Sequence, residues 1–324
     1  MRILVTGGAG FIGSHLCERL ITEGHTVTAL DNISTGRVSN LLNLTGSKNF
    51  TFVEGSILDT HLLTNLTKKA DYIFHLAAAV GVFNIVNNPL ASLLTNIRGT
   101  ENVLEASNNL NIPVFLTSSS EVYGKNTSDS LKESDDRILG SPVTLRWSYS
   151  EAKAIDESLA YSYFVEKNLE TRIVRFFNTV GPRQLGSYGM VVPRFIKSAL
   201  ENEPITVYGD GNQTRCFAHV YDVIDAVMAI AFSDDTIGKV INVGNDFEIS
   251  INDLAQLVVA EVNSESEIVH VPYEEAYGDG FEDMERRVPN IDLINQLVGW
   301  RPKRNLSEMI TDISSEMKRE LKEK

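Results

Sequence analysis

The stretch that decides the fold is Arg2-Ile-Leu-Val-Thr-Gly-Gly-Ala-Gly-Phe-Ile-Gly-Ser-His-Leu16. The apolar run at residues 3–5 predicts a buried parallel strand, and apolar residues recur at helical spacing after the turn. Between the two, Gly7, Gly10 and Gly13 allow the backbone to approach a pyrophosphate closely. The amides and dipole at the start of the helix would face that pyrophosphate. The stretch therefore predicts a strand, a turn and a helix that together bind a nucleotide.

An acidic residue, Asp31, ends the next predicted strand, at residues 25–31. It lies 24 residues past Gly7, near the separation expected for a carboxylate that accepts from the adenosine ribose hydroxyls. A 2′-phosphate would meet like charge there, so NAD is favoured over NADP. A simpler reading, in which Asp31 only caps a turn with Asn32, stays open.

The rest of the chain predicts an α/β fold with a Rossmann-type doubly wound parallel sheet, because strands alternate with helices. Further strands are expected at residues 50–55, 70–78 and 113–118, with helices at 58–69 and 96–109. From about Val180 the elements shorten, and helices are expected at residues 192–201, 220–232, 251–262 and 306–321. We expect an NAD-binding domain at residues 1–178 and a smaller C-terminal substrate-binding domain at 179–324. Residues from about 213 to 245 could instead return to the first domain, and this alternative stays open.

The composition is that of a globular protein, with 43% hydrophobic and 22% charged residues among 324. Its 29 basic and 43 acidic side chains give a net charge of −14, which speaks against nucleic acid or an anionic membrane as partner. The six histidines show no metal-ligand spacing, so no metal is expected. Cys17 and Cys216 are expected to be small buried hydrophobic residues. No apolar run approaches the ~18 residues of a membrane span, so a cytoplasmic location is expected.

Tyr149 and Lys153 lie one helical turn apart on the same predicted face. The pKa of a tyrosine, normally near ~10, would be lowered by the lysine and by a nicotinamide cation, so that the phenolate could take a proton from a substrate hydroxyl. Such a pair alone is common on helix surfaces. It gains weight because it follows the fifth strand of a nucleotide fold, whose end is the serine-rich segment 117–124.

These motifs, together with His75-Leu-Ala-Ala78, Arg175-Phe-Phe-Asn178 and Gly181-Pro-Arg183, resemble the extended short-chain dehydrogenase/reductase family. Its members are nucleotide-sugar epimerases, dehydratases and decarboxylases, and the resemblance covers essentially the whole chain. It implies a tightly held NAD that oxidises a sugar carbon, usually carbon 4, and later returns the hydride. It also implies that Tyr149 is the base, that Lys153 orients the ribose and that Ser119 bonds the reacting oxygen.

The same resemblance gives a set of candidate binding residues. Those expected at the cofactor are Gly7, Gly10, Phe11, Ile12, Gly13, Asp31, Asn32, Ser34, Thr35, Gly36, Ser56, Ile57, Leu76, Ala77, Ala78, Asn96, Thr117, Tyr149 and Lys153. Those expected at the nucleotide-sugar substrate are Ser120, Glu121, Asn178, Arg183, Val192, Arg194, Val207, Tyr208, Arg215 and Arg287. Ser56 departs from the aspartate that the family often has near the adenine. Val207 and Tyr208 have an alternative reading as a packing pair in a hairpin.

Two features favour one branch of the family. Ser120 stands where 4,6-dehydratases usually have an acidic Asp, and Glu121 stands where simple 4-epimerases carry a small or uncharged residue. Segment 119–124 and Arg287-Val-Pro-Asn290 are similar to segments of UDP-glucuronate decarboxylases, which form UDP-xylose or a UDP-4-keto-pentose. The resemblance thus implies that Glu121 and Arg287 hold the substrate carboxylate and help to reprotonate carbon 5.

Other readings stay open at this point. Glu121 could serve only as an ion-pair partner and Arg287 only as a phosphate ligand. A UDP-sugar 4-epimerase, a nucleotide-sugar dehydratase and an NAD-sensing regulator are the alternative functions. The family also implies a homodimer built on the helices at 96–109 and 149–166. The apolar residues on these helices, which would also serve packing against the sheet, are Val103, Leu104, Ile155 and Leu159.

Overall fold

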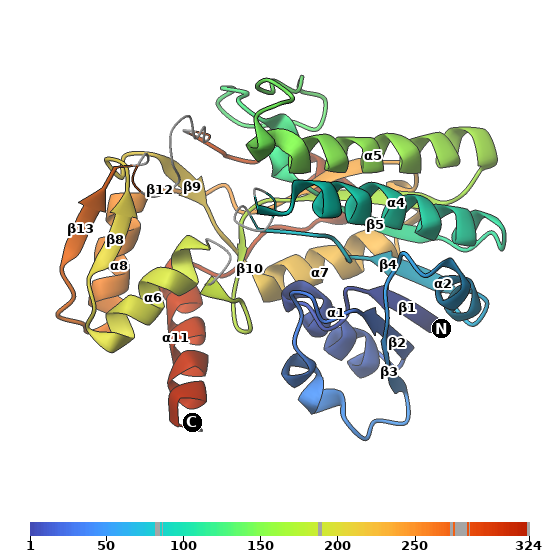
Figure 1. Ribbon diagram of the computed structural model, residues 1–324, viewed down its shortest axis with the longest axis horizontal. Helices are drawn as coiled ribbons and strands as arrows, with labels where there is room; N and C mark the ends of the chain where they lie inside the picture. Colours follow the sequence, from blue (N-terminus) through green and yellow to red (C-terminus); the bar gives the residue numbers. More distant parts are fainter. Residues whose placement is uncertain are drawn as a thin grey trace.

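A computed structural model gives the structure of the protein. The residues that it describes are 1–81, 85, 87–186, 190–272, 275, 284 and 286–322. They form two lobes, a larger one around a parallel sheet and a smaller one of mixed helices and short strands (Figure 1).

The larger lobe is built on a seven-stranded sheet in which every neighbouring pair is parallel. Its strands are β1 (Arg2–Thr6), β2 (Thr26–Asp31), β3 (Phe50–Glu54), β4 (Tyr72–His75), β5 (Val114–Ser119), β6 (Thr171–Phe176) and β11 (Val240–Val243). They lie in the order β11-β6-β5-β4-β1-β2-β3, so the winding direction reverses between β1 and β4. The predicted doubly wound sheet is confirmed, and ligands bind outside such a reversal point.

Helices cover both faces of this sheet, as Figure 1 shows. On one face lie α2 (Thr60–Thr67), α4 (Pro89–Asn108) and α5 (Ser148–Lys167), and on the other α1 (Phe11–Thr22), α7 (Val220–Ala231) and α10 (Asp292–Val298). Helix α4 begins well before the predicted residue 96, because Pro89 occupies its first turn, where a missing N–H costs nothing. Among the described residues, short 3₁₀ helices lie in the connections: η1 (Val38–Leu44), η2 (Ser120–Tyr123), η3 (Leu145–Trp147) and η5 (Asp234–Thr236).

The smaller lobe has its own hydrophobic core, formed mainly by helices α6, α8 and α11. Its elements are α6 (Val191–Glu201), α8 (Ile251–Val262), α11 (Leu306–Lys322), β8 (Ile205–Tyr208), β9 (Thr214–Cys216), β12 (Glu248–Ser250) and β13 (Ile268–Val271). Strand β8 pairs in parallel with β13, so the hairpin reading of Val207 and Tyr208 is wrong. The short parallel pair β7 (Thr179–Val180) and β10 (Ala218–His219) lies where the chain passes between the lobes.

The chain returns to the larger lobe twice after entering the smaller one. The first return is α7 and β11, since α7 is apolar on most of its surface and packs into the core under the sheet. The second is α10 with Trp300, whose indole donates to the Asp222 carbonyl at 3.0 Å. The sequence pattern did not indicate this second return. The domain boundary at residue 178 stays a prediction.

Cys17 and Cys216 are both buried and free, as expected. Within the described part of the chain, no helix is both long and apolar enough to cross a membrane.

Candidate active site

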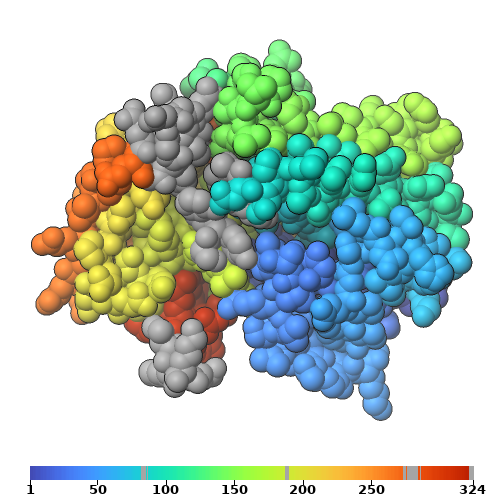
Figure 2. All heavy atoms as spheres, in the orientation of Figure 1, coloured from blue at the N-terminus to red at the C-terminus, as the bar shows by residue number. Residues whose placement is uncertain are grey.

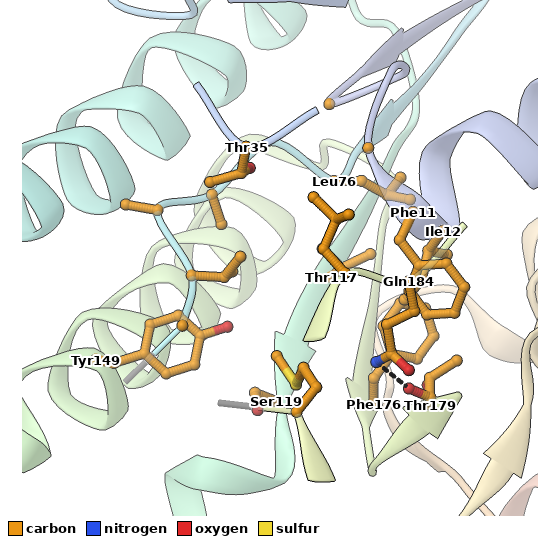
Figure 3. A pocket seen from close by; sticks show the side chains of 18 of the residues that line it. Phe11, Ile12, Thr35, Leu76, Thr117, Ser119, Tyr149, Phe176, Thr179 and Gln184 are labelled. Atoms are coloured by element: carbon orange, nitrogen blue, oxygen red, sulfur yellow. Dashed lines mark hydrogen bonds between the residues drawn. The ribbon is translucent and has the colours of Figure 1, made fainter. Parts of the chain in front are cut away.

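One cavity of about 710 Å³ lies at the carboxyl ends of the sheet strands, and residues of both lobes line it. Its volume is that of a small-molecule site. The segments that follow β1, β4 and β5 form one wall, and side chains from α6, β8 and β9 form the other. Figure 2 shows the smaller lobe, coloured mainly yellow to red, beside the larger lobe, coloured mainly blue to green, and Figure 3 looks into the cavity.

The glycine turn after β1 packs against the segment after β4 so tightly that side chains are excluded. Gly7 has a φ of +71°, and a Cβ on it would lie 2.7 Å from the Ala77 nitrogen. A Cβ on Gly13 would lie 2.1 Å from the Gly7 carbonyl oxygen. Both glycines line the cavity. The glycines therefore let the backbone at the start of α1 pack directly against its neighbours beside the cavity, in the tight arrangement typical of a pyrophosphate-binding turn.

Asp31, at the end of β2, also lines the cavity. Its Oδ2 accepts from the Ala9 amide at 3.0 Å and its Oδ1 from the Ile33 amide at 2.8 Å. Burial raises the pKa of Asp31, and these amides partly offset the effect. The carboxylate therefore does more than cap its own turn, since it joins that turn to the glycine turn. Asn32 organises the loop separately, through its bond from the Ser34 amide at 3.1 Å.

All but three of the predicted binding residues line this cavity; the exceptions are Gly36, Asn96 and Val207. Gly36 packs against the Ala9 backbone, where a Cβ would come within 2.9 Å. The Asn96 side chain is turned to the loop after β4, accepting from the Ala79 amide at 2.7 Å and donating to its carbonyl at 3.2 Å. Val207 points into the core of the smaller lobe. These three residues therefore lie behind the cavity walls and support them.

The predicted catalytic residues meet in this cavity. Ser119 ends β5 and Tyr149 lies in the first turn of α5, and Figure 3 shows both side chains entering the cavity. Burial raises the pKa of Tyr149, while Lys153 and the Ser119 hydroxyl lower it. Among the protein's own groups the net shift is upward, so the expected lowering is not achieved by Lys153 alone.

Glu121 lies two residues past Ser119, between two buried arginines. Its Oε2 accepts from Arg146 Nη1 at 2.6 Å and its Oε1 from Arg287 Nη1 at 2.8 Å. Arg287 Nη1 also donates to the Ser120 hydroxyl at 3.2 Å. Burial alone would raise the pKa of Glu121, but Arg287 and Arg146 bring it down to about 2. The carboxylate is thus ionised and held in place at any physiological pH.

The segment that carries Arg287 is fastened to the larger lobe. The Leu131 amide donates to the Val288 carbonyl at 2.8 Å, and the Asn290 amide donates to the Leu131 carbonyl at 2.8 Å. Next to Arg287, Arg286 binds both oxygens of Glu248 at 2.8 Å in the bidentate geometry typical of strong arginine pairs. The Leu131 bonds hold this segment on the larger lobe, and the Arg286–Glu248 pair joins it to β12 of the smaller lobe, so Arg287 is fixed from both sides.

Five predicted substrate residues line the cavity wall provided by the smaller lobe or its connections: Asn178, Val192, Arg194, Tyr208 and Arg215. The Arg194 guanidinium lies 4.3 Å from the centre of the Tyr208 ring, which places a cation and an aromatic face together there. Arg183 differs from the expectation. It contacts α1, donating to the Ser14 hydroxyl at 3.1 Å and to Glu18 at 2.6 Å, and so lies on the glycine-turn side of the cavity.

Sequence reasoning missed two charged residues of this site, Arg146 and Asp156. Arg146 precedes Tyr149 by one helical turn and holds Glu121, and Asp156 follows Lys153 by three residues and pairs with it at 3.2 Å. Spacings of three on a helix place side chains on one face, so both could have been found from their distance to Tyr149 and Lys153.

The described residues contain no group of three or more His, Cys, Asp and Glu that could hold a metal ion. His75 packs under the cavity, with Nδ1 2.7 Å from the Thr6 hydroxyl and Nε2 3.1 Å from the Thr100 hydroxyl. Burial lowers the pKa of His75 to about 3, so it stays neutral.

Comparisons with known proteins agree with this geometry. A family model described as GDP-mannose 4,6-dehydratase matches residues 4–313. The chain is 41% identical over 302 residues to UDP-N-acetyl-alpha-D-glucosaminuronate decarboxylase of Bacillus cytotoxicus, covering 93% of this chain and 92% of that protein. It is 36% identical over 322 residues to UDP-glucuronic acid decarboxylase 1 of Danio rerio, covering 99% of this chain and 73% of that protein.

Solved structures of similar fold cover nearly the whole chain. The UDP-glucuronic acid 4-epimerase of Bacillus cereus, in complex with UDP-glucuronic acid and NAD, matches with a TM-score of 0.88 at 29% identity, over 98% of this chain and 99% of that one. The UDP-glucose 4-epimerase of Thermotoga maritima, with UDP-glucose, matches with a TM-score of 0.89 at 30% identity, over 99% and 100%. By sequence, by sheet order and by the arrangement of its site, the chain belongs to the GDP-mannose 4,6-dehydratase family of extended short-chain dehydrogenases/reductases.

Proposed function

We propose that the protein is an NAD-dependent decarboxylase of UDP-linked uronic acids, which converts UDP-glucuronate to UDP-xylose or to a UDP-4-keto-pentose. The observation that carries this proposal is the position of Arg287, which Glu121 holds beside Ser120 in the cavity that Ser119 and Tyr149 also line. A guanidinium at that place is suited to a substrate carboxylate next to the reacting carbon.

The cavity fits NAD, because Gly7 and Gly13 allow the tight turn at the start of α1 and Asp31 offers a carboxylate near that turn. Gly7, Gly13, Asp31 and Lys153 would hold the cofactor, and the carboxylate would disfavour a 2′-phosphate. When bound, NAD supplies a hydride acceptor for the sugar carbon and, later, a hydride donor.

The chain's own residues act on the sugar oxygen and on the carboxylate. Tyr149 takes the proton of the 4-hydroxyl as that carbon is oxidised, and Ser119 donates a hydrogen bond to the same oxygen. The resulting 4-ketone is β to the carboxylate, so carbon dioxide can leave while the electrons of the broken carbon–carbon bond delocalise into the ketone as an enolate, which then takes a proton at carbon 5 from water. Arg287 orients the carboxylate before that step. A Tyr149 pKa raised by burial also makes the phenol a competent proton donor when the ketone is reduced.

The role expected for Glu121 changes. A carboxylic acid whose pKa is about 2 holds no proton at neutral pH and would repel a uronate. Glu121 is therefore proposed to position Arg287 and Arg146, and not to reprotonate carbon 5 or to bind the substrate carboxylate directly. In this proposal Glu121 contributes to function as an ion-pair partner of the two arginines.

The alternatives within the family fit less well. Expulsion of water from carbon 6 needs an acid, and Ser120, at that place, is occupied by a bond from Arg287 at 3.2 Å. A 4-epimerase has no need of a carboxylate clamp, although a uronate epimerase would share it. Among uronates, UDP-N-acetylglucosaminuronate is a second candidate substrate, because the relative named for that sugar is 41% identical to this chain.

The test is incubation of the purified holoenzyme with UDP-glucuronate and, in parallel, UDP-N-acetylglucosaminuronate, followed by mass spectrometry of the products. We expect a product lighter by carbon dioxide from one of them. A product of unchanged mass would indicate epimerisation. Retained NAD without conversion of any nucleotide sugar would favour an NAD-sensing regulator.

We also propose a homodimer that pairs α4 and α5 with their copies. Val103 and Leu104 are buried against the sheet and are not available for this contact, but Ile155 is 41% and Val165 57% exposed. Leu159 lies partly buried beside them. Ile155→Glu should shift the mass measured by light scattering from dimer to monomer, and an unchanged mass would contradict this interface.

A cytoplasmic location is proposed as well, because the two cysteines are free thiols, as is usual in a reducing compartment.

A further inference from the structure

Asp156 is a fully buried carboxylate on α5 that binds the proposed active-site lysine. Lys153 Nζ donates to Asp156 Oδ2 at 3.2 Å and to the Thr117 carbonyl at 3.0 Å. The side chains of Lys153 and Asp156 are 3% and 0% exposed. An ammonium group carries three donors, so these two contacts leave one for a ligand in the cavity. Asp156 thus restrains Lys153 on the protein side and leaves its third donor for the proposed cofactor.

The pair also affects Tyr149 through charge. Lys153 stabilises the phenolate, and the negative charge of Asp156 acts in the opposite sense on the same group. Because water is excluded from this pair, each charge acts over a longer range than it would at the surface. Burial lowers the pKa of Lys153, but attraction to Asp156 more than offsets this, so the lysine stays charged.

The other charged groups near Tyr149 are already paired. Glu121 lies between Arg287 and Arg146. Glu157, next to Asp156 in sequence, binds Arg175 through both oxygens, at 2.9 and 2.8 Å, and accepts from the Ser118 hydroxyl. His75, under the same strand ends, is neutral. Within the described chain, Asp156 is therefore the anion paired directly with Lys153.

We propose that Asp156 is a positioning residue that anchors Lys153 and sets the strength of Tyr149 as a base. The inference rests on the role proposed above for Tyr149. A group that first takes a proton and later returns it works best with its pKa near the working pH. An uncompensated buried ammonium would favour the phenolate strongly, which helps proton removal and hinders proton return. Asp156 moderates that imbalance.

The test removes the negative charge of Asp156 with little change in the shape of the side chain. The holoenzyme is labelled with [¹³Cζ]tyrosine, the Tyr149 resonance is assigned with Tyr149→Phe, and its pH titration is followed by NMR. In Asp156→Asn, and in the smaller Asp156→Ser, the first deprotonation of the Tyr149–Lys153 pair should shift down by about one pH unit. Asp156→Glu, which keeps the charge, should titrate close to the parent.

Glu151→Gln is the matched control, because it removes a carboxylate from the same helix that is part-exposed and paired with Arg137 at 3.3 Å. It should leave the titration unchanged. The acid limb of kcat with the uronate substrate should move with the NMR titration. A downward shift without uronate turnover would support Asp156 and contradict the proposed function. If the enzyme turns over the uronate but Asp156→Asn and Asp156→Ser both titrate like the parent, the role proposed for Asp156 is wrong and the proposed function stands.

Discussion

The glycine turn and the Glu121 cluster line the same cavity but are built in opposite ways. The turn is a run of residues 7–13 whose shape is fixed by backbone contacts, such as the Gly10 amide donating to the Gly7 carbonyl at 3.1 Å. The cluster joins Glu121, Arg146 and Arg287, which come from three separate segments. The glycine turn, proposed to bind the cofactor, is therefore local in sequence. The Glu121 cluster, proposed to select the reaction, is assembled from segments that are far apart in sequence.

This difference follows from what each part must do. Binding a pyrophosphate needs backbone amides and a helix start, which a few consecutive residues can supply. Placing an arginine beside one carbon of a sugar needs side chains fixed from several directions. The cluster therefore depends on the register between Leu131 and Val288, and on the Arg286–Glu248 pair, neither of which touches the cavity wall.

The largest effect is expected from filling the glycine turn. Gly13→Val should abolish NAD binding, because even the Cβ of the new side chain would lie 2.1 Å from the Gly7 carbonyl oxygen. Activity should fall by more than roughly 10³-fold, because the chemistry depends on the cofactor. The readout is NAD released from denatured protein. Gly10→Ala is the graded control, since its Cβ would lie 3.1 Å from the same oxygen. Equal NAD retention in both variants would contradict the close approach.

A large but different effect is expected from the cluster. Arg287→Gln should lower decarboxylation by roughly 10²-fold to 10³-fold, because one buried partner of Glu121 and the carboxylate ligand are lost together. Bound NAD should be unchanged, which separates this part of the site from the glycine turn. Arg301→Gln makes the same substitution at an exposed arginine and is the matched control, so it should leave decarboxylation unchanged. Loss of NAD from Arg287→Gln would show that the two parts are not independent.

A smaller effect is expected from the anchor of this segment. Arg286→Gln removes the bidentate pair with Glu248 and should lower decarboxylation by roughly tenfold through misplacement of Arg287. The double variant with Arg287→Gln should lose little more than Arg287→Gln alone, because both act through one group. Additive losses measured in kcat/KM would argue for a separate role of Arg286.

The smallest effect near neutral pH concerns the titration of Glu121. Its folded pKa of about 2 lies below the ordinary value of about 4.3, so its ion pairs contribute roughly 3 kcal/mol that is complete above the unfolded pKa. The difference in unfolding free energy between the parent and Glu121→Gln should be constant from about pH 8 to 5 and shrink as the pH falls from about 4.5 toward 2. Urea unfolding over this range measures it. A difference that already shrinks near pH 6 would mean that Glu121 is not ionised as described.

Much of the molecule could be predicted from local pattern. The strands β1 to β5 and the helices α6, α7, α8 and α11 lie within a few residues of their expected positions, because apolar periodicity and the glycine turn are properties of consecutive residues. The boundaries that failed have local causes, such as Pro89 starting α4 early. The motifs around Ser119, Tyr149 and Lys153 likewise indicated which residues would share one cavity.

The sequence by itself thus determined the sheet, the glycine turn and the set of residues proposed for acid–base chemistry. Only the tertiary structure decided what surrounds them: the pairing of Glu121 with two arginines, the pairing of Lys153 with Asp156, and the turning of Asn96 and Val207 away from the cavity. The physical reason is that a pKa and a side-chain direction depend on burial and on charges brought together by distant segments, which no local pattern encodes. Glu121 shows this most clearly, since the same residue would be a proton donor alone and is a fixed anion between Arg146 and Arg287.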